Sequence, residues 1–283
     1  MREALDRCEH RREYAGLTYV YTVLSRRAGG ISVGVNLTPR NTCNWRCIYC
    51  QVPHLQRGGA QPADPDRLAE ELRWILRELL RGGLMADLAP EGKGIIQDIA
   101  LAGNGEPTTS PNFDVAVSKI VEVMTEFELI GRVKLRLLTN GSLITRLKVR
   151  RALEEMAQVN GEVWFKVDSV NRAGVRHING INQAVVRMDK NLRIAARLCP
   201  TWLQTCLFAW DGQPPPLRET QAYLGFVKRL REQGVPLEGV HLYGVARPVQ
   251  QPESPRIAPL PMSWVQQFAD QIQSLGMRVR TSF

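Results

Sequence analysis

Six short apolar runs alternate along the chain with longer segments of helical periodicity, and this alternation limits the fold more than any other feature. The runs expected to be strands are Ile31–Leu37, Asp98–Ala102, Lys134–Leu138, Glu162–Val167, Trp202–Ala209 and Gly239–Val245. The segments expected to be helices are Asp66–Arg81, Phe113–Glu128, Thr145–Gln158, Gln183–Leu198, Pro216–Gln233 and Ser263–Leu275. Parallel strands need such crossover helices, and six units suit an open barrel better than a closed eight-stranded one. The sequence therefore predicts an α/β fold, a partial (β/α)6 TIM-like barrel with parallel strands.

The chain is long enough for one such barrel with short additions at both ends. Its 283 residues are 44% hydrophobic and 23% charged, a composition that supports a buried core and argues against disorder. We expect an N-terminal extension over residues 1–24, the barrel over 25–249, and a C-terminal extension over 250–283 whose final helix packs on the barrel. The stretch Gln250–Pro261 is rich in proline and lacks periodicity.

Charge and hydropathy narrow the choice of partners. The net charge of +9 is compatible with an RNA partner, but the basic residues are spread along the chain without a long Lys/Arg run, which favours a solvated basic surface or small anionic substrates. The segment Met1–Arg12 is charged and lacks the apolar stretch of a signal peptide, and no run of about 18 apolar residues occurs. We expect a cytoplasmic protein without a membrane partner.

A cluster of cysteines follows the first predicted strand. Cys43, Cys47 and Cys50 have the spacing Cys-x3-Cys-x2-Cys in a loop at the carboxyl end of that strand, where parallel sheets place their sites. Three thiolates this close can hold one iron-sulfur cluster and leave one iron without a protein ligand. Structural zinc with His54 as a fourth ligand is the alternative, although zinc ligands usually come as two separated pairs.

This motif, with an aromatic residue directly before the third cysteine, resembles the signature of the radical S-adenosylmethionine (SAM) superfamily. The resemblance implies a 4Fe-4S cluster on Cys43, Cys47 and Cys50, and S-adenosylmethionine chelated to the open iron. It also implies reductive cleavage of that cofactor to a 5'-deoxyadenosyl radical, driven by an external one-electron donor of the flavodoxin or ferredoxin type. Tyr49 takes the role of the aromatic residue beside the adenine, and plain loop packing is its alternative.

The segment Gly103-Asn104-Gly105-Glu106 follows the second predicted strand. Glycines allow close backbone approach to a ligand, and a carboxylate at a strand end can accept a hydrogen bond from an ammonium group. Asn-Gly alone is also an ordinary turn. The segment resembles the Gly-Gly-Glu-Pro motif of the superfamily, which binds the methionyl amine of the cofactor, with Asn104 as a departure from the usual form.

Polar residues at the next two strand ends are further candidates for binding the cofactor. Asn140 follows the third run and is compatible with a turn role as well. Lys166 and Asp168 lie two positions apart at the end of the fourth run, and charged residues there need a partner or a cavity. At the end of the sixth run, Arg247 is suited to an anion or to a loop cap.

The remaining titratable residues give no second site. Cys199 and Cys206 flank a predicted strand at roughly 23 Å from each other, so with Cys8 they are not expected to form another cluster. His177 and His241 are expected to be ordinary polar residues, and no catalytic residue is assigned.

The entry and cluster loops resemble a compact subgroup of the superfamily that is related to the wybutosine-synthesis enzyme. The chain has no flavodoxin domain, so the tRNA reaction of that enzyme does not transfer. We expect a radical SAM enzyme of unassigned substrate, with tRNA base modification or modification of a protein or small metabolite as branches. Two alternatives from other classes are a cluster protein that only binds or transfers electrons, and a zinc-binding RNA module.

Overall fold

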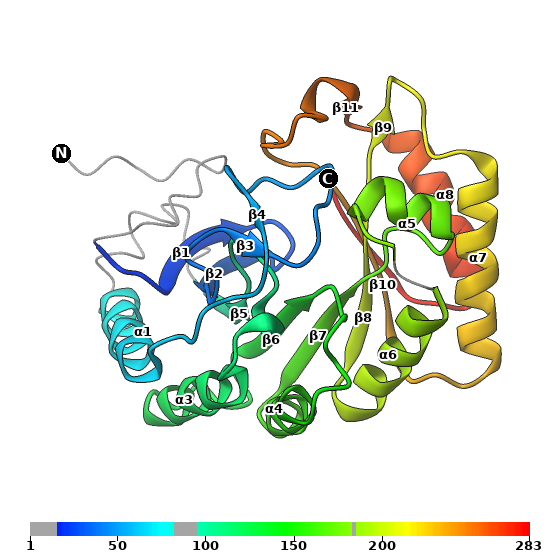
Figure 1. The fold of residues 1–283 in the computed structure, drawn as a ribbon. Helices are drawn as coiled ribbons and strands as arrows, with labels where there is room; N and C mark the ends of the chain where they lie inside the picture. The colour runs from blue at the N-terminus through cyan, green and yellow to red at the C-terminus, as the bar shows by residue number, and fades with distance from the viewer. Residues whose placement is uncertain (1–15, 82–94, 183–184) are drawn as a thin grey trace.

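A curved sheet forms the centre of the molecule. The computed structural model describes residues 16–81, 95–182 and 185–283 (Figure 1), and in them eight strands lie in the order β1-β2-β5-β6-β7-β8-β10-β12. Their bounds are β1 Val20–Ser25, β2 Gly30–Val35, β5 Ile96–Leu101, β6 Lys134–Thr139, β7 Gly161–Lys166, β8 Thr201–Leu207, β10 Leu237–Gly244 and β12 Val279–Ser282. Two short ribbons join β3 (Thr42–Cys43) to β4 (Gln56–Arg57) and β9 (Ala209–Trp210) to β11 (Ile257–Ala258).

Within the eight-stranded sheet, neighbouring strands from β2 to β12 run parallel, and β1 pairs antiparallel with β2. The ribbon of β9 and β11 is also antiparallel. All six predicted strands are present in the predicted order, and each strand end lies within two residues of the expected bound. Over the described ranges, the edge strands β1 and β12 do not pair with each other, so the sheet curls without closing. The prediction of a partial, TIM-like α/β barrel is confirmed.

In the described part of the chain, six long helices cover the outer side of the sheet (Figure 1). They are α1 Pro65–Leu80, α3 Phe113–Glu126, α4 Leu147–Gln158, α6 Val185–Leu198, α7 Leu217–Glu232 and α8 Met262–Ser274. Each buries an apolar stripe, as α1 does with Leu72, Ile75 and Leu79, which are fully buried in the main core. Asp64 caps α1 by accepting a hydrogen bond from the backbone N–H of Arg67.

The sequence analysis did not predict every element of the described residues. Besides the two short ribbons, it missed β1, β12 and the short helix α5 (Arg172–Asn179), which ends at Gly180 in the left-handed region. Strands β1 and β12 come from the expected terminal extensions, and each adds one strand to the sheet. Two predictions lie outside the described residues: the first residues of the helix expected from Gln183, and Cys8 with the rest of residues 1–15.

A buried acid ties the first strand to the first helix. The Glu71 carboxylate on α1 accepts backbone N–H groups of Tyr19 at 2.7 Å and Val20 at 3.2 Å, where β1 begins. Helix α1, on the outer side of the sheet, therefore fixes the start of the edge strand β1. No helix in the described part of the chain has the length and hydropathy to cross a membrane.

Candidate functional site

The three clustered cysteines line a cavity of about 220 Å³ at the carboxyl ends of the parallel strands. Side chains from four successive strand ends share it, as the rule for parallel sheets predicts. Among its lining residues are Cys43, Cys47, Cys50, Tyr49, Gly103, Gly105, Glu106, Asn140 and Lys166. Asn104 and Asp168 are described by the structure but do not line this cavity.

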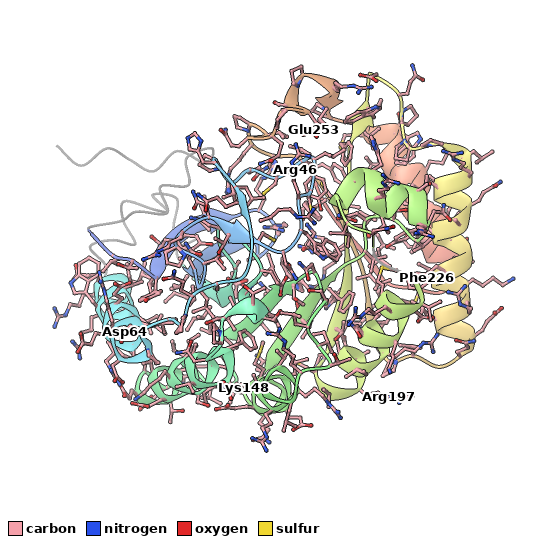
Figure 2. The ribbon with its side chains drawn as sticks, in the orientation of Figure 1. Arg46, Asp64, Lys148, Arg197, Phe226 and Glu253 are labelled. Atoms are coloured by element: carbon pink, nitrogen blue, oxygen red, sulfur yellow. The ribbon has the colours of Figure 1, made fainter. Side chains whose placement is uncertain are left out.

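The cysteine loop is fixed at several points along its length. The N–H groups of Arg46 and Ile48 donate to the carbonyls of Asn179 and Ile178 on α5, at 3.0 and 2.9 Å. The Arg46 guanidinium forms a two-pronged ion pair with Glu253 at 2.8 and 3.0 Å, and Figure 2 shows these two side chains together at the top of the molecule. Such contacts give the loop one defined conformation before any ligand binds.

The glycine-rich segment packs directly under this loop. A Cβ on Gly105 would overlap the carbonyl oxygen of Thr42, and one on Gly103 would overlap the side chain of Asn36. The Asn36 side chain accepts the N–H of Asn104 at 3.1 Å. Only glycine allows this approach, so the segment and the loop that carries Cys43 are held in register.

Glu106 is buried, and its two carboxylate oxygens have different surroundings. Oε1 accepts hydrogen bonds from the hydroxyls of Thr108 at 2.5 Å and Thr139 at 2.6 Å, whereas Oε2 accepts the N–H of Asn140 at 2.7 Å. Burial raises the pKa of Glu106, although these hydrogen bonds oppose the shift. Oε2 keeps a lone pair for one more donor in the cavity.

Asn140 connects the end of β6 to the cysteine loop. Besides its backbone bond to Glu106, its side-chain amide donates to Asn44 at 2.8 Å, and Asn44 donates in turn to Ser142 at 2.8 Å. Its Oδ1 also accepts the N–H of Ser142 at 3.0 Å, which is the turn role, and the residue lines the cavity. The ligand role stays a prediction.

Lys166 projects from the end of β7 into the cavity. Its ammonium lies 3.7 Å from the sulfur of Cys47, 3.8 Å from Asp168, and 4.7 Å from the ring centre of Tyr49. Burial disfavours the ammonium, but the negative groups around it, Cys47 first, outweigh that cost and raise the pKa of Lys166 well above its ordinary value. The cavity thus contains one fixed positive charge beside a cysteine sulfur.

Asp168 lies just past β7 and organises its neighbours. Its fully buried carboxylate accepts the Tyr49 hydroxyl at 2.5 Å, the Asn179 amide at 2.7 Å and the N–H of Cys206 at 3.1 Å. Because these donors use the carboxylate, Asp168 orients Tyr49 rather than facing the cavity. The Tyr49 ring is buried against Phe208 at 5.7 Å between ring centres.

The buried position of two of the thiols disfavours their thiolate form. Burial raises the pKa of Cys43 to about 12 and also raises that of Cys47, while Lys166 lowers both. A metal centre supplies the same compensation, since metal ligands must be thiolates. The residues that the structure describes contain no compact group of three or more His, Cys, Asp or Glu side chains around a single ion. The zinc alternative gains no support, because His54 is exposed and does not line the cavity.

Two neighbours of the cysteines were not assigned to the site from the sequence. Asn179 on α5 donates to the Cys47 sulfur at 3.4 Å, and its Asn-Gly pair at a helix end was the signal available. Cys206 on β8 lines the cavity, whereas Cys199 is buried in the main core. Arg247 lines the cavity at the strand end where the sequence placed it.

The two histidines have ordinary structural surroundings. His241 is buried edge-on against Trp164 and lies 2.9 Å from the Ser282 hydroxyl, and burial with nearby arginines lowers its pKa to about 3. His177 packs edge-on against Trp210.

Known proteins share this fold. Two solved structures are similar over most of the chain. The first is TYW1 with a lysine-pyruvate adduct bound, with a TM-score of 0.57 and 15% identity; the match covers 86% of this chain and 73% of the TYW1 chain. The second is SuiB of Streptococcus suis bound to S-adenosylmethionine, with a TM-score of 0.54 and 11% identity; the match covers 88% of this chain and 45% of the SuiB chain. At these identities the likeness shows the fold alone.

Sequence relatives include UPF0026 proteins of Helicobacter pylori, 32% identical over 59% of this chain and 50% of the relative, and of Methanocaldococcus jannaschii, 27% identical over 62% and 48%. The chain spans about half the length of the relatives it matches. The sequence model of the Radical SAM superfamily matches residues 37–212, which is more than half of the chain and includes the cysteine loop. The chain therefore belongs to the radical SAM superfamily.

Proposed function

We propose that this chain is a radical SAM enzyme that reductively cleaves S-adenosylmethionine at the cavity described above. The observation that carries the proposal is the convergence of Cys43, Cys47 and Cys50 with Glu106 and Lys166 on one cavity at the strand ends. When bound there, a 4Fe-4S cluster with one open iron would supply the electron that breaks the sulfonium carbon–sulfur bond, giving a 5'-deoxyadenosyl radical.

The surrounding residues divide into ligand-binding and supporting groups under this proposal. The three cysteines hold the cluster, and the open lone pair of Glu106 Oε2 accepts the cofactor's ammonium. The backbone at Gly103 and Gly105 and the side chain of Asn140 border the methionyl and ribose groups. Tyr49 offers its buried ring beside the adenine.

Asn104 and Asp168 act through neighbours in this arrangement. Asn104 donates to Asn41 at 2.6 Å, and so fixes the glycine-rich segment to the cysteine loop. Asp168 orients Tyr49 and balances Lys166, whose charge lies beside Cys47.

The proposal requires an external one-electron donor of the flavodoxin or ferredoxin type, and it places the enzyme in the cytoplasm, where thiols stay reduced. Transferase, lyase and oxidoreductase outcomes all start from the same cleavage. The likeness to TYW1 concerns the fold alone and does not favour tRNA as the substrate.

Anaerobic reconstitution tests the proposal. Protein loaded with iron and sulfide, reduced with dithionite and given S-adenosylmethionine should bind about four irons per chain and form 5'-deoxyadenosine, measured by chromatography. Cys47→Ser should abolish both. Cys199→Ser is the control and should retain both, because Cys199 lies in the main core away from the loop. A fully loaded wild-type protein that forms no 5'-deoxyadenosine contradicts the proposal.

A further inference from the structure

A second cavity, of about 370 Å³, occupies the interior of the half-barrel beside the first. Tyr21, Arg27, Tyr243 and Arg247 are among the residues that line both cavities, so the two cavities are neighbours. The second cavity extends along the open side of the sheet, between residues of β1 and Ser282 of β12. A molecule bound there would lie next to the proposed cofactor.

Arg27 provides the unusual charge in this interior. It lies in the turn between β1 and β2, is half-buried, and rests its guanidinium over the rings of Tyr243 at 5.1 Å and Trp164 at 5.8 Å. Within residues 16–81, 95–182 and 185–283 it forms no hydrogen bond or ion pair. Two cation–π contacts restrain this guanidinium, and its planar set of N–H donors suits an oxyanion.

The other interior charges already have protein partners. Arg136 lies between Asp98 and Glu162, with 3.3 Å to the latter, and Lys166 is paired with Asp168. His241 stays neutral, since burial and then Arg27 lead the causes that lower its pKa. Arg26 and Arg247 also line this cavity, but Arg26 is exposed and Arg247 has another interaction within the described residues. Arg27 is therefore the half-buried positive charge that the negative group of a ligand would balance.

We propose that the substrate is a small carboxylic acid whose carboxylate pairs with Arg27 inside the barrel, an inference that rests on the radical function proposed above. The volume lies in the range of small-molecule pockets, about 300–1,000 Å³. One carboxylate charge matches the Arg27 guanidinium, whereas a phosphate ester brings a charge of about −1.5 to −2 next to the buried Asp98, which also lines this cavity. The rest of the acid extends toward the cavity of the cysteines.

Ligand-observed NMR on the full chain, with and without a reconstituted cluster, tests this. The probes are propionate, succinate, 2-oxoglutarate, glycerol 3-phosphate and unfractionated tRNA. At least one of the acids should bind the wild type. Its affinity for Arg27→Gln should be at least about tenfold lower, and its affinity for Arg27→Lys, which keeps the charge but loses the planar set of donors, should be intermediate. Arg132→Gln removes an exposed charge elsewhere and should bind as the wild type does.

Three outcomes would each overturn the inference. They are equal binding of the acids to wild type and Arg27→Gln, binding of glycerol 3-phosphate or tRNA only, and no binding of any acid. Thermal melting of each variant checks that it is folded. The outcome is separable from the proposed function: a wild type that binds an acid through Arg27 but forms no 5'-deoxyadenosine contradicts the radical activity and leaves the anion site standing.

Discussion

The ammonium of Lys166 lies 3.7 Å from the sulfur of Cys47, although the two residues are 119 positions apart in the chain. A positive charge at this place would stabilise the reduced state of a cluster held by Cys47, so its removal makes reduction less favourable. Lys166→Met should therefore lower the reduction potential of the cluster by about 60 mV, the size of a tenfold change for a one-electron couple. EPR-monitored potentiometric titration measures the shift. Lys228→Met, at an exposed position on α7, is the control, and equal potentials in both variants would exclude this role for Lys166.

Glu106→Gln tests the residue proposed to bind the cofactor's ammonium. The change removes a negative charge and leaves the donors from Thr108, Thr139 and Asn140 with a poorer acceptor. S-adenosylmethionine affinity should fall by at least about tenfold, and unfolding free energy by about 1–3 kcal/mol, while iron content is kept. Equilibrium dialysis and denaturant titration give the two values, with the exposed Glu154→Gln as control. Unchanged cofactor affinity counts against the assignment.

The raised pKa of Glu106 predicts a pH dependence of cofactor binding. Burial raises this pKa, so the folded protein takes up a proton at a pH where an exposed glutamate stays ionised. Affinity for S-adenosylmethionine should fall as the pH falls through the raised pKa, because the neutral acid no longer attracts an ammonium. For folding, the same shift stabilises the protein at low pH and loses that contribution as the pH rises through the folded pKa. Dialysis from pH 8 to 5 should show the decline in the wild type and not in Glu106→Gln.

Gly105→Ala tests whether the close approach of two segments builds the site. The added Cβ would overlap the Thr42 carbonyl, one residue before Cys43, so the loop must move. We expect a loss of about 1–3 kcal/mol in unfolding free energy and a clear drop in bound iron. Gly58→Ala in the same region adds its Cβ to open space and should change neither value. Full iron loading of Gly105→Ala would show that the approach is not needed.

Local sequence patterns predicted six strands, the long helices and the cysteine loop, because these features depend on residues that are close in the chain. The six strand cores are continuous buried runs, and the spacing of Cys43, Cys47 and Cys50 places them in one loop. The edge strand β12 is short and half-exposed, and α5 has only eight residues with polar composition, so neither gives a strong periodic signal. These elements are held by tertiary contacts.

The arrangement inside the site also exceeds what periodicity can predict. Period-two alternation put Lys166 and Asp168 on one face, but β7 ends at Lys166, and beyond a strand end the alternation no longer sets side-chain direction. Lys166 lines the cavity, whereas Asp168 turns to Tyr49 and Asn179. The contact of Asn179 with Cys47 spans 132 positions and follows from the packing of α5 alone.

The most direct test of the central claim is the EPR spectrum of the reduced, reconstituted protein recorded with and without S-adenosylmethionine. If Cys43, Cys47 and Cys50 leave one iron open to the cofactor, the signal should change on addition of S-adenosylmethionine. It should keep its shape with 5'-deoxyadenosine, which lacks the amino and carboxylate groups that would bind the iron. A cluster signal that is identical with and without S-adenosylmethionine contradicts the claim.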